Sequence, residues 1–159
     1  MDTQRHACEI DARRRVALRC VAGLVAGAIA GPVSARDRTP EIVQPRTAGR
    51  EGFMERAFEM RRRAIERGDQ PYGAIIVKGD RIVGEGVSAV VTDNDPTAHA
   101  EMQAIRDAAR RLGTRDLTSC EMYGTSRACP MCEAAAYWAR IATMYYGTSI
   151  ADAGAPRLP

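Results

Sequence analysis

The body of the chain opens with hydrophobic side chains that recur at helical spacing between Phe53 and Ile65. Gly68 and Asp69 follow this repeat and predict the end of the helix. Three arginines at residues 61–63 fall mostly away from the apolar stripe. We therefore interpret them as a solvated helix face rather than a phosphate site.

Two strands and a second helix come next. Residues 74–77 form an unbroken apolar run that predicts a buried strand, and residues 82–91 predict another strand after a tight turn. Asp95 stands where an N-cap is expected and Pro96 at the first helical position. The expected buried face of this helix, which Gly113 closes, consists of Met102, Ile105, Ala109 and Leu112.

The remaining elements are a strand at 120–124, a helix at 130–140 and a last strand at 141–146. The order α-β-β-α-β-α-β predicts an α/β domain with three layers, α/β/α, around a mixed sheet. We expect an open sheet edge at the last strand, which favours pairing with a second copy. This domain is placed at residues 51–159, after a linker at 36–50.

The first 35 residues have a different composition. Arginines at 13–15 precede an apolar stretch at 16–30 and small residues at 33–35, a pattern typical of a secretory signal peptide. Arg14 and Arg15 also resemble a twin-arginine signal, so we predict an exported, periplasmic protein. The clean apolar length is too short for a membrane span. The alternative is a non-functional extension on a cytoplasmic protein.

Composition and charge exclude several classes of protein. Of the 159 residues, 45% are hydrophobic and 27% are charged, which suits one globular domain rather than a disordered or multi-spanning membrane protein. After residue 35 the chain has 18 basic and 17 acidic residues. This near-neutral balance gives no strong signal for nucleic-acid binding.

The candidate chemistry lies in two short motifs. His99 and Glu101 stand near the start of one predicted helix, and Cys129 and Cys132 stand at the start of another. Two thiolates and an imidazole suit zinc, and three protein ligands leave one position open, as in catalytic sites. On an ideal helix, His99 and Glu101 lie about 200° apart, so both reach one metal only if the helix meets it end-on. Glu101 is then the candidate proton acceptor.

Four segments resemble a known family: PYGAIIVK at 71–78, NDPTAHAE at 94–101, CPMC at 129–132 and YWAR at 137–140. The chain is similar to the zinc-dependent cytidine and purine deaminases, with their H-x-E and C-x-x-C motifs. The resemblance is strongest to the bacterial guanine deaminase (nucleoside deaminase) branch. It implies a cytidine-deaminase-like fold, a small nucleobase or nucleoside as substrate, and a homodimer.

The resemblance also implies roles for individual residues. Zinc is expected to be held by His99, Cys129 and Cys132. Glu101 is expected to carry protons between water and the leaving amino nitrogen. The expected contacts of the base are the main chain of Ala100 and the side chains of Ser88, Tyr72 and Trp138. For the two aromatic side chains, a place in the core is an equal alternative.

Three features depart from the family's pattern. Ser88 stands where the family has an asparagine that hydrogen-bonds the base, so base recognition is expected to be looser or different. Arg127 and Ala128 replace a Glu-Pro pair before the first zinc cysteine. The chain ends at Pro159, before the segment that closes the pocket in guanine deaminases, so we expect a C-terminally short domain.

Three functions follow as alternatives. The leading one is zinc-dependent hydrolytic deamination of a purine base or related aminated heterocycle, with guanine as the favoured substrate. The second is deamination of adenosine in tRNA, against which the near-neutral charge argues. The third is a degenerate, non-catalytic zinc-binding module, which the three departures favour.

The other cysteines have separate interpretations. Cys8 and Cys20 fall in the predicted leader. Cys120 suits a buried strand residue, a fourth zinc ligand or a disulfide partner.

Overall fold

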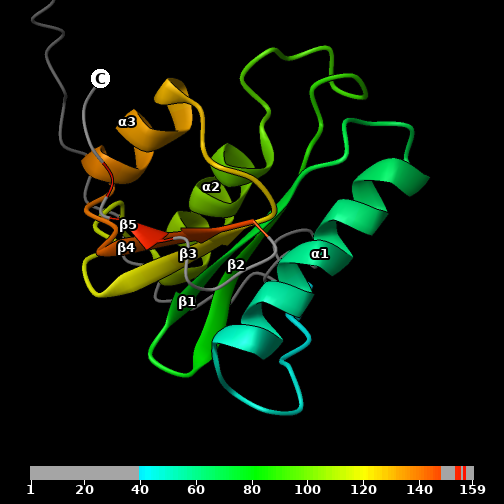
Figure 1. Ribbon diagram of the computed structural model, residues 1–159. Helices are drawn as coiled ribbons and strands as arrows, with labels where there is room; N and C mark the ends of the chain where they lie inside the picture. The colour runs from blue at the N-terminus through cyan, green and yellow to red at the C-terminus, as the bar shows by residue number, and fades with distance from the viewer. Residues whose placement is uncertain (1–39, 148–152, 155, 157–159) are drawn as a thin grey trace, which may run out of the picture. The chain divides into compact units, whose positions relative to one another are not determined.

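The structure is a computed structural model that describes residues 40–147, 153–154 and 156 (Figure 1). The predicted leader at 1–35, with Cys8 and Cys20, and the first residues of the predicted linker lie outside the described residues. The elements of the described part are α1 (Arg50–Glu66), β1 (Gly73–Lys78), β2 (Arg81–Val87), α2 (Ala100–Leu112), β3 (Cys120–Gly124), α3 (Pro130–Trp138), β4 (Thr143–Tyr146) and β5 (Ala153–Gly154).

The described part of the predicted linker packs against the sheet. Ile42 is buried with the side chains under α1. The side chain of Gln44 accepts a hydrogen bond from the amide of Ile82 at 2.8 Å and donates one to the carbonyl of the same residue at 3.0 Å. None of the helices in the described ranges is long and apolar enough to cross a membrane.

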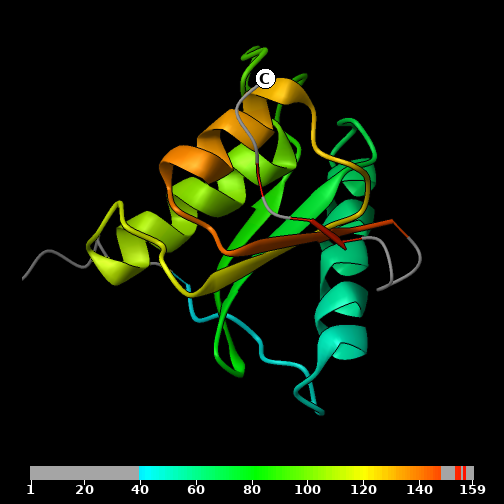
Figure 2. The same cartoon turned by 60° about the vertical axis from the view of Figure 1, so that its left-hand side comes forward.

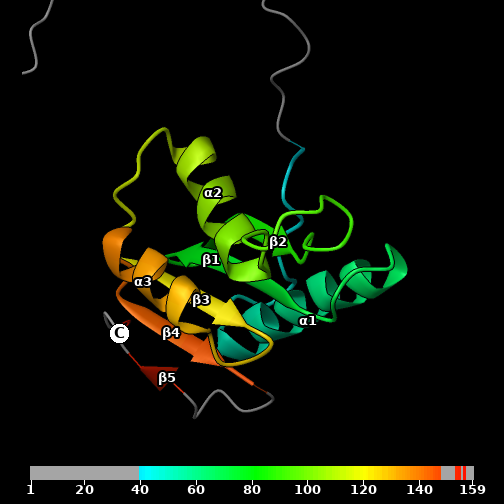
Figure 3. The same ribbon diagram turned by 90° about the horizontal axis from the view of Figure 1, so that it is seen from above.

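The sheet is mixed, as predicted, with the strand order β2-β1-β3-β4-β5. β1 is antiparallel to both β2 and β3, whereas β3 and β4 are parallel. Parallel neighbours need a crossover connection, and α3 provides it (Figure 3). The sequence pattern did not reveal β5, because two residues are too few to show a period. β5 pairs with Met144 and Tyr145, so the edge of β4 that we expected to be open has a partner there.

The helices cover both faces of the sheet: α1 lies on one face, and α2 and α3 lie on the other (Figures 2 and 3). Successive strand residues point to opposite faces. In β1, Ile75 and Val77 therefore pack with Phe53 of α1, whereas Ala74 and Ile76 pack on the side of α2 and α3. The predicted three-layer α/β/α architecture is confirmed.

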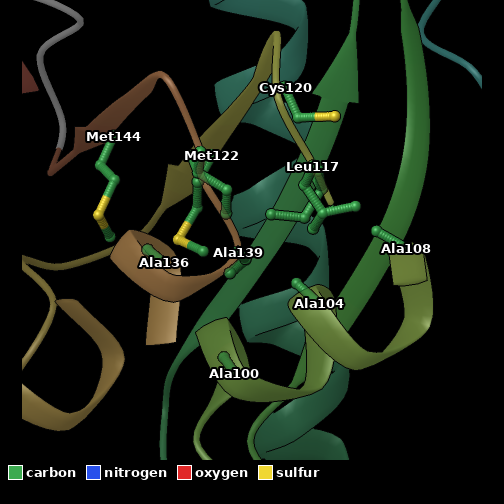
Figure 4. Close-up of a cluster of buried hydrophobic side chains, with 12 residues drawn as sticks. Ala100, Ala104, Ala108, Leu117, Cys120, Met122, Ala136, Ala139 and Met144 are labelled. Atoms are coloured by element: carbon green, nitrogen blue, oxygen red, sulfur yellow. The ribbon is translucent and has the colours of Figure 1, made fainter. Parts of the chain in front are cut away.

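The contact between α2 and β2 is very close, because small residues face each other across it. A Cβ atom at Gly86 would lie 2.0 Å from the carbonyl oxygen of Ala100, and one at Gly84 would lie 2.7 Å from the Cβ of Ala108. The α2 alanines buried in this core are Ala100, Ala104 and Ala108 (Figure 4). Gly86 thus sets the position of the first turn of α2, and Gly84 that of the turns that follow.

The buried face predicted for this helix is wrong. Its predicted members are only half-buried: Met102, Ile105, Ala109 and Leu112. The periodicity argument assigns the largest apolar side chains to the core. Here the backbones approach so closely opposite Gly84 and Gly86 that alanines occupy the contact, and Ile105 and Leu112 pack at the margin of the core.

The predicted start of α2 at Asp95 and Pro96 is also wrong, because the helix begins at Ala100 with His99 as its N-cap. The Asp95 carboxylate accepts hydrogen bonds from the amide and hydroxyl of Thr97, at 2.8 and 2.7 Å. Its capping ability therefore serves a local turn before the helix.

β2 ends at Val87 and does not continue to residue 91. The amides of Val91 and Thr92 donate to the carboxylate of Asp69 instead of to a neighbouring strand. The chain after β2 is therefore a loop bound to the segment before β1.

Candidate metal centre and active site

Two helix N-termini bring the candidate metal ligands together. His99 is the N-cap of α2 and Cys129 is the N-cap of α3, and neither side chain makes a capping hydrogen bond. Pro130 occupies the first helical position of α3, where a missing N–H costs nothing, and Cys132 follows in the same turn. His99 lies before the helix and has an extended backbone, so the angle of about 200° expected between two helical residues does not apply to the side chains of His99 and Glu101.

The three ligand atoms form a triangle of the size that zinc requires. The sulfurs of Cys129 and Cys132 are 3.7 Å apart, and Nδ1 of His99 lies 3.6 and 3.7 Å from them, respectively. With bonds of about 2.3 Å to sulfur and about 2.0 Å to nitrogen, tetrahedral zinc places two sulfurs about 3.8 Å apart and sulfur and nitrogen about 3.5 Å apart. A disulfide would need a separation of about 2.05 Å. The residues therefore fit a zinc ion.

The electrostatics of this triangle also favour a cation. Burial raises the pKa of the Cys132 thiol, and the nearby Glu101 carboxylate and Cys129 raise it further. A buried thiolate beside a carboxylate needs a positive charge to compensate it, and a metal ion supplies that charge. The partial positive charge at the N-terminus of α3 acts in the same direction.

Glu101 lies beside the triangle without belonging to it. Its Oε2 atom is 3.7 Å from Sγ of Cys132. Among the described residues, the group able to hold a metal consists of His99, Cys129 and Cys132. Glu101 is 6% exposed, and burial raises the pKa of its carboxyl, against the lowering effects of its own amide and of His99. The site thus has three ligands and one free, buried acid.

The ligand-bearing loops are both attached to Tyr72 and Gly73, a short segment where β1 begins. The amide of Gly73 donates to Oγ1 of Thr125 at 3.1 Å, and the amide of Thr125 donates to the carbonyl of Gly73 at 3.0 Å. The loop that starts at Thr125 leads to Cys129. On the other side, the amide of Ser88 donates to the carbonyl of Tyr72 at 3.1 Å. The segment therefore links the two halves of the metal centre.

Two of the expected base contacts lie deep in the structure. Ala100, the first residue of α2, is fully buried next to His99. Ser88 is also buried, and its hydroxyl donates to Oδ1 of Asp69 at 2.8 Å. The Ser88 hydroxyl is therefore already engaged within the protein.

The two aromatic candidates are exposed, so the alternative that places them in the core is wrong. Tyr72 is 41% exposed and Trp138 is 72% exposed. Trp138 ends α3, at the opposite end from Cys129, and packs edge-on against Tyr137. With Arg140 and other residues, this pair lines a hollow of about 640 Å³ that includes none of the three metal ligands.

The positions of Arg127 and Cys120 in the structure decide how these two residues are interpreted. Arg127 is 74% exposed and lies 4.0 Å from Glu133, so the replacement of the family's acid puts a solvated cation two residues before Cys129. Cys120 is fully buried in β3, is free, and lies outside the metal-binding group. Of its three interpretations, the buried strand residue is confirmed.

Sequence reasoning missed Asp69, which we interpreted only as the end of a helix. Its carboxylate is 8% exposed and accepts hydrogen bonds from the loop between β2 and α2. An aspartate after Gly68 equally suits a helix end, so the sequence carries little signal for this role.

The comparison with protein families decides the classification. A family model described as the cytidine and deoxycytidylate deaminase zinc-binding region matches residues 48–148. The chain belongs to this deaminase family. The predicted resemblance is thereby confirmed, and so is zinc as the cofactor, since the family is zinc-binding and the chain holds a matching His/Cys/Cys group.

Several members of the deaminase family are similar to this chain. Guanine deaminase of Bacillus subtilis (strain 168) is 43% identical over 104 residues, which are 65% of this chain and 67% of that protein. A tRNA-specific adenosine deaminase of Aquifex aeolicus is 46% identical over 93 residues, 58% of this chain and 62% of the relative. The X-ray structure of the Bacillus guanine deaminase matches with a TM-score of 0.60 at 43% identity, covering 62% of this chain and 64% of that one. The chain thus spans about two thirds of the length of these relatives.

The prediction of an exported protein is wrong. The matched relatives are a guanine deaminase and tRNA-specific adenosine deaminases, and they give no support to export. The pattern on which the prediction rested lies in residues 1–35, outside the described ranges. Arginine and small apolar residues are common in this chain as a whole, which weakens a motif built from them.

Proposed function

We propose that this protein catalyses the zinc-dependent hydrolytic deamination of a purine base or a related aminated heterocycle, with guanine as the expected substrate. One observation carries the proposal: three ligand atoms lie at zinc-binding separations, and a buried carboxylate lies beside them without being a ligand. A structural zinc site normally uses four protein ligands. Three ligands and an adjacent acid suit hydrolysis.

When bound, zinc acts as a Lewis acid that makes water easier to deprotonate. The protein's own task is to move the proton. In this mechanism, a carboxylate oxygen of Glu101 accepts a proton from the attacking water and then donates it to the leaving amino nitrogen. Water is consumed, ammonia is released, and the carboxylate returns to its ionised form. A raised pKa suits this role, because the acid must hold the proton between the two steps.

The base would be held by the protein around this acid. The main chain of Ala100 adjoins both His99 and Glu101, which supports its role as a base contact. Tyr72 offers an exposed ring beside the loop of Ser88. Trp138 lies at the far end of α3 from Cys129, so its contact would be with the outer part of a substrate.

Deamination of adenosine in tRNA is the second candidate. It is favoured by the Aquifex relative, whose identity to this chain is similar to that of the guanine deaminase. The near-neutral charge of the body favours a small molecule instead, because RNA binding draws on a basic surface. A non-catalytic zinc module is the third, and it is favoured by Arg127 in place of the family's acid.

The test is ammonia release from a panel of guanine, guanosine, adenine, cytosine, cytidine and a tRNA with an adenosine in its anticodon. We expect turnover with guanine and little or none with tRNA. Turnover with tRNA alone would establish the second candidate. Absence of turnover with every substrate of the panel, in a sample that contains stoichiometric zinc, would contradict guanine as the substrate and favour the third.

The proposal includes a homodimer, as the resemblance implies. The exposed rings of Tyr137 and Trp138 would support an interface, since aromatic side chains contribute strongly to binding between proteins. Sedimentation equilibrium of the purified protein gives its mass in solution, and a monomer at all concentrations would contradict this part of the proposal.

A further inference from the structure

We infer that Asp69 is a positioning residue of the active site, and that Ser88 acts through Asp69 rather than as a contact of the base. The inference rests on the proposed deaminase function and adds to it a residue outside the metal centre. It concerns the loop between β2 and α2, which leads directly to His99 and Glu101.

The Asp69 carboxylate gathers five hydrogen bonds. Oδ1 accepts from the amide of Gln70 and the hydroxyl of Ser88, both at 2.8 Å. Oδ2 accepts from the amides of Val91 and Thr92, at 2.9 and 2.8 Å, and from the hydroxyl of Thr92 at 3.0 Å. Four of the five come from residues 88–92, so one side chain ties that loop to the segment before β1.

The bound loop is joined to the metal centre through its backbone. The amide of Ala89 donates to the carbonyl of Ala98 at 2.9 Å, and Ala98 immediately precedes His99. On the other side, Ser88 donates its amide to Tyr72, beside which Gly73 pairs with the loop that leads to Cys129. Displacement of residues 88–92 would therefore shift the wall of the site without removing a ligand.

The chemistry of the hydroxyl determines what Ser88 can do. A serine hydroxyl has one hydrogen, and here that hydrogen is directed to Asp69. Burial raises the pKa of Asp69, but the hydrogen bonds from Thr92, Ser88 and Gln70 together hold it well below its ordinary value. The carboxylate is therefore an acceptor only, and Ser88 has no hydrogen left to donate to a substrate.

The first test compares three variants by steady-state kinetics. Asp69→Ala removes all five hydrogen bonds, and we expect KM for the substrate to rise by about tenfold or more while kcat changes less. Asp69→Asn is the conservative rescue. Its amide oxygen can replace Oδ2, and its NH₂ group can donate to the hydroxyl of Ser88, so only the hydrogen bond from Gln70 is lost. The matched control is Asp80→Ala, an exposed aspartate in the turn between β1 and β2.

A double-mutant cycle separates the two roles of Ser88. If Ser88 acts through Asp69, Ser88→Ala lowers kcat/KM by about threefold or more in the wild-type background and has little further effect in Asp69→Ala. If Ser88 contacts the base directly, the same substitution has an equal effect in both backgrounds. That second result would overturn the inference.

Hydrogen exchange provides a readout that does not depend on turnover. The amide hydrogens of Val91 and Thr92 should exchange at least about tenfold faster in Asp69→Ala than in Asp80→Ala, with zinc content unchanged. If Asp69→Ala does not fold, Thr92→Val and Ser88→Ala each remove one donor and are measured in its place. An inactive wild type would contradict the proposed function alone. Exchange rates equal to the control would contradict the role of Asp69.

Discussion

Oε2 of Glu101 lies 3.7 Å from Sγ of Cys132, yet Glu101 is not one of the three metal ligands. Both side chains come from the first turn of a helix, Glu101 in α2 and Cys132 in α3. A ligand and a free acid are thus held side by side by two separate elements. This arrangement makes metal binding and proton transfer separable by mutation.

Glu101→Gln should abolish turnover while leaving zinc bound. Glutamine keeps the size of the side chain but cannot accept and return a proton, so we expect kcat to fall by at least about 100-fold. Ammonia release and metal analysis on the same sample measure the two properties. Glu66→Gln, on the exposed end of α1, is the control for a lost acid. Turnover that survives in Glu101→Gln would contradict the assignment of the proton carrier.

The metal centre was predictable from the sequence because its ligands stand in short motifs. Cys129 and Cys132 belong to one helix turn, so their spacing alone brings the sulfurs together. His99 is distant from the two cysteines in the sequence, and only the fold brings it to them. A zinc site with two cysteines commonly includes a histidine, however, and His99 stands in a matching motif. The ligands were therefore recognisable even though the start of α2 was placed four residues too early.

Cys132→Ala should lose zinc, whereas Cys120→Ala should retain it. Two remaining ligands bind zinc much more weakly than three, and Cys132 is the buried member of the pair. Cys120 is equally buried but lies in β3, outside the metal-binding group. Zinc per protein chain, measured after dialysis, distinguishes the variants. Loss of zinc from Cys120→Ala, with the fold intact, would indicate a fourth ligand.

Gly86→Ala should destabilise the protein and disturb the site. The new Cβ would lie 2.0 Å from the carbonyl oxygen of Ala100 and 2.5 Å from the amide nitrogen of Ala104, so the backbone of α2 must move. We expect the free energy of unfolding to fall by more than about 2 kcal/mol and turnover to fall with it, because Glu101 is in the same turn.

The control for this substitution is Gly79→Ala. A Cβ at Gly79 meets nothing within 4 Å, but its φ of +59° disfavours alanine, which costs about 1 kcal/mol without reaching the site. Urea denaturation measures the free energy of unfolding of both variants. A similar loss of stability in the two variants would contradict the close contact between β2 and α2.

The contacts that the sequence did not reveal are tertiary contacts, in which two elements distant in the sequence pack against each other. The glycine-alanine contact between β2 and α2 has no periodic signal, since the larger residues of α2 also recur at helical spacing. The role of Asp69 depends on a loop that begins 19 residues later at Ser88. Neither relationship follows from local propensity, because each is decided by the arrangement of two elements in space.

The acid dependence of stability should identify Asp69 independently of catalysis. The pKa of Asp69 is lowered in the folded protein, so its stabilising contribution is fully present above the unfolded value of about 4. That contribution is lost as the pH falls through the folded pKa. Asp69→Asn has no such titration. The difference in unfolding free energy between wild type and Asp69→Asn should therefore be constant from about pH 7 to 5 and shrink below about pH 4.

The donors to Asp69 are amides and hydroxyls, so none of them changes charge over this range. Other carboxylates titrate equally in both proteins and cancel in the difference. Urea denaturation at several pH values between 7 and 3 measures it, and Asp80→Asn serves as the exposed control. An ionised carboxylate that accepts these hydrogen bonds must lose some of them when it takes up a proton. If the difference in unfolding free energy between wild type and Asp69→Asn stays constant or grows in acid, the Asp69 carboxylate does not bind the loop as an ionised acceptor.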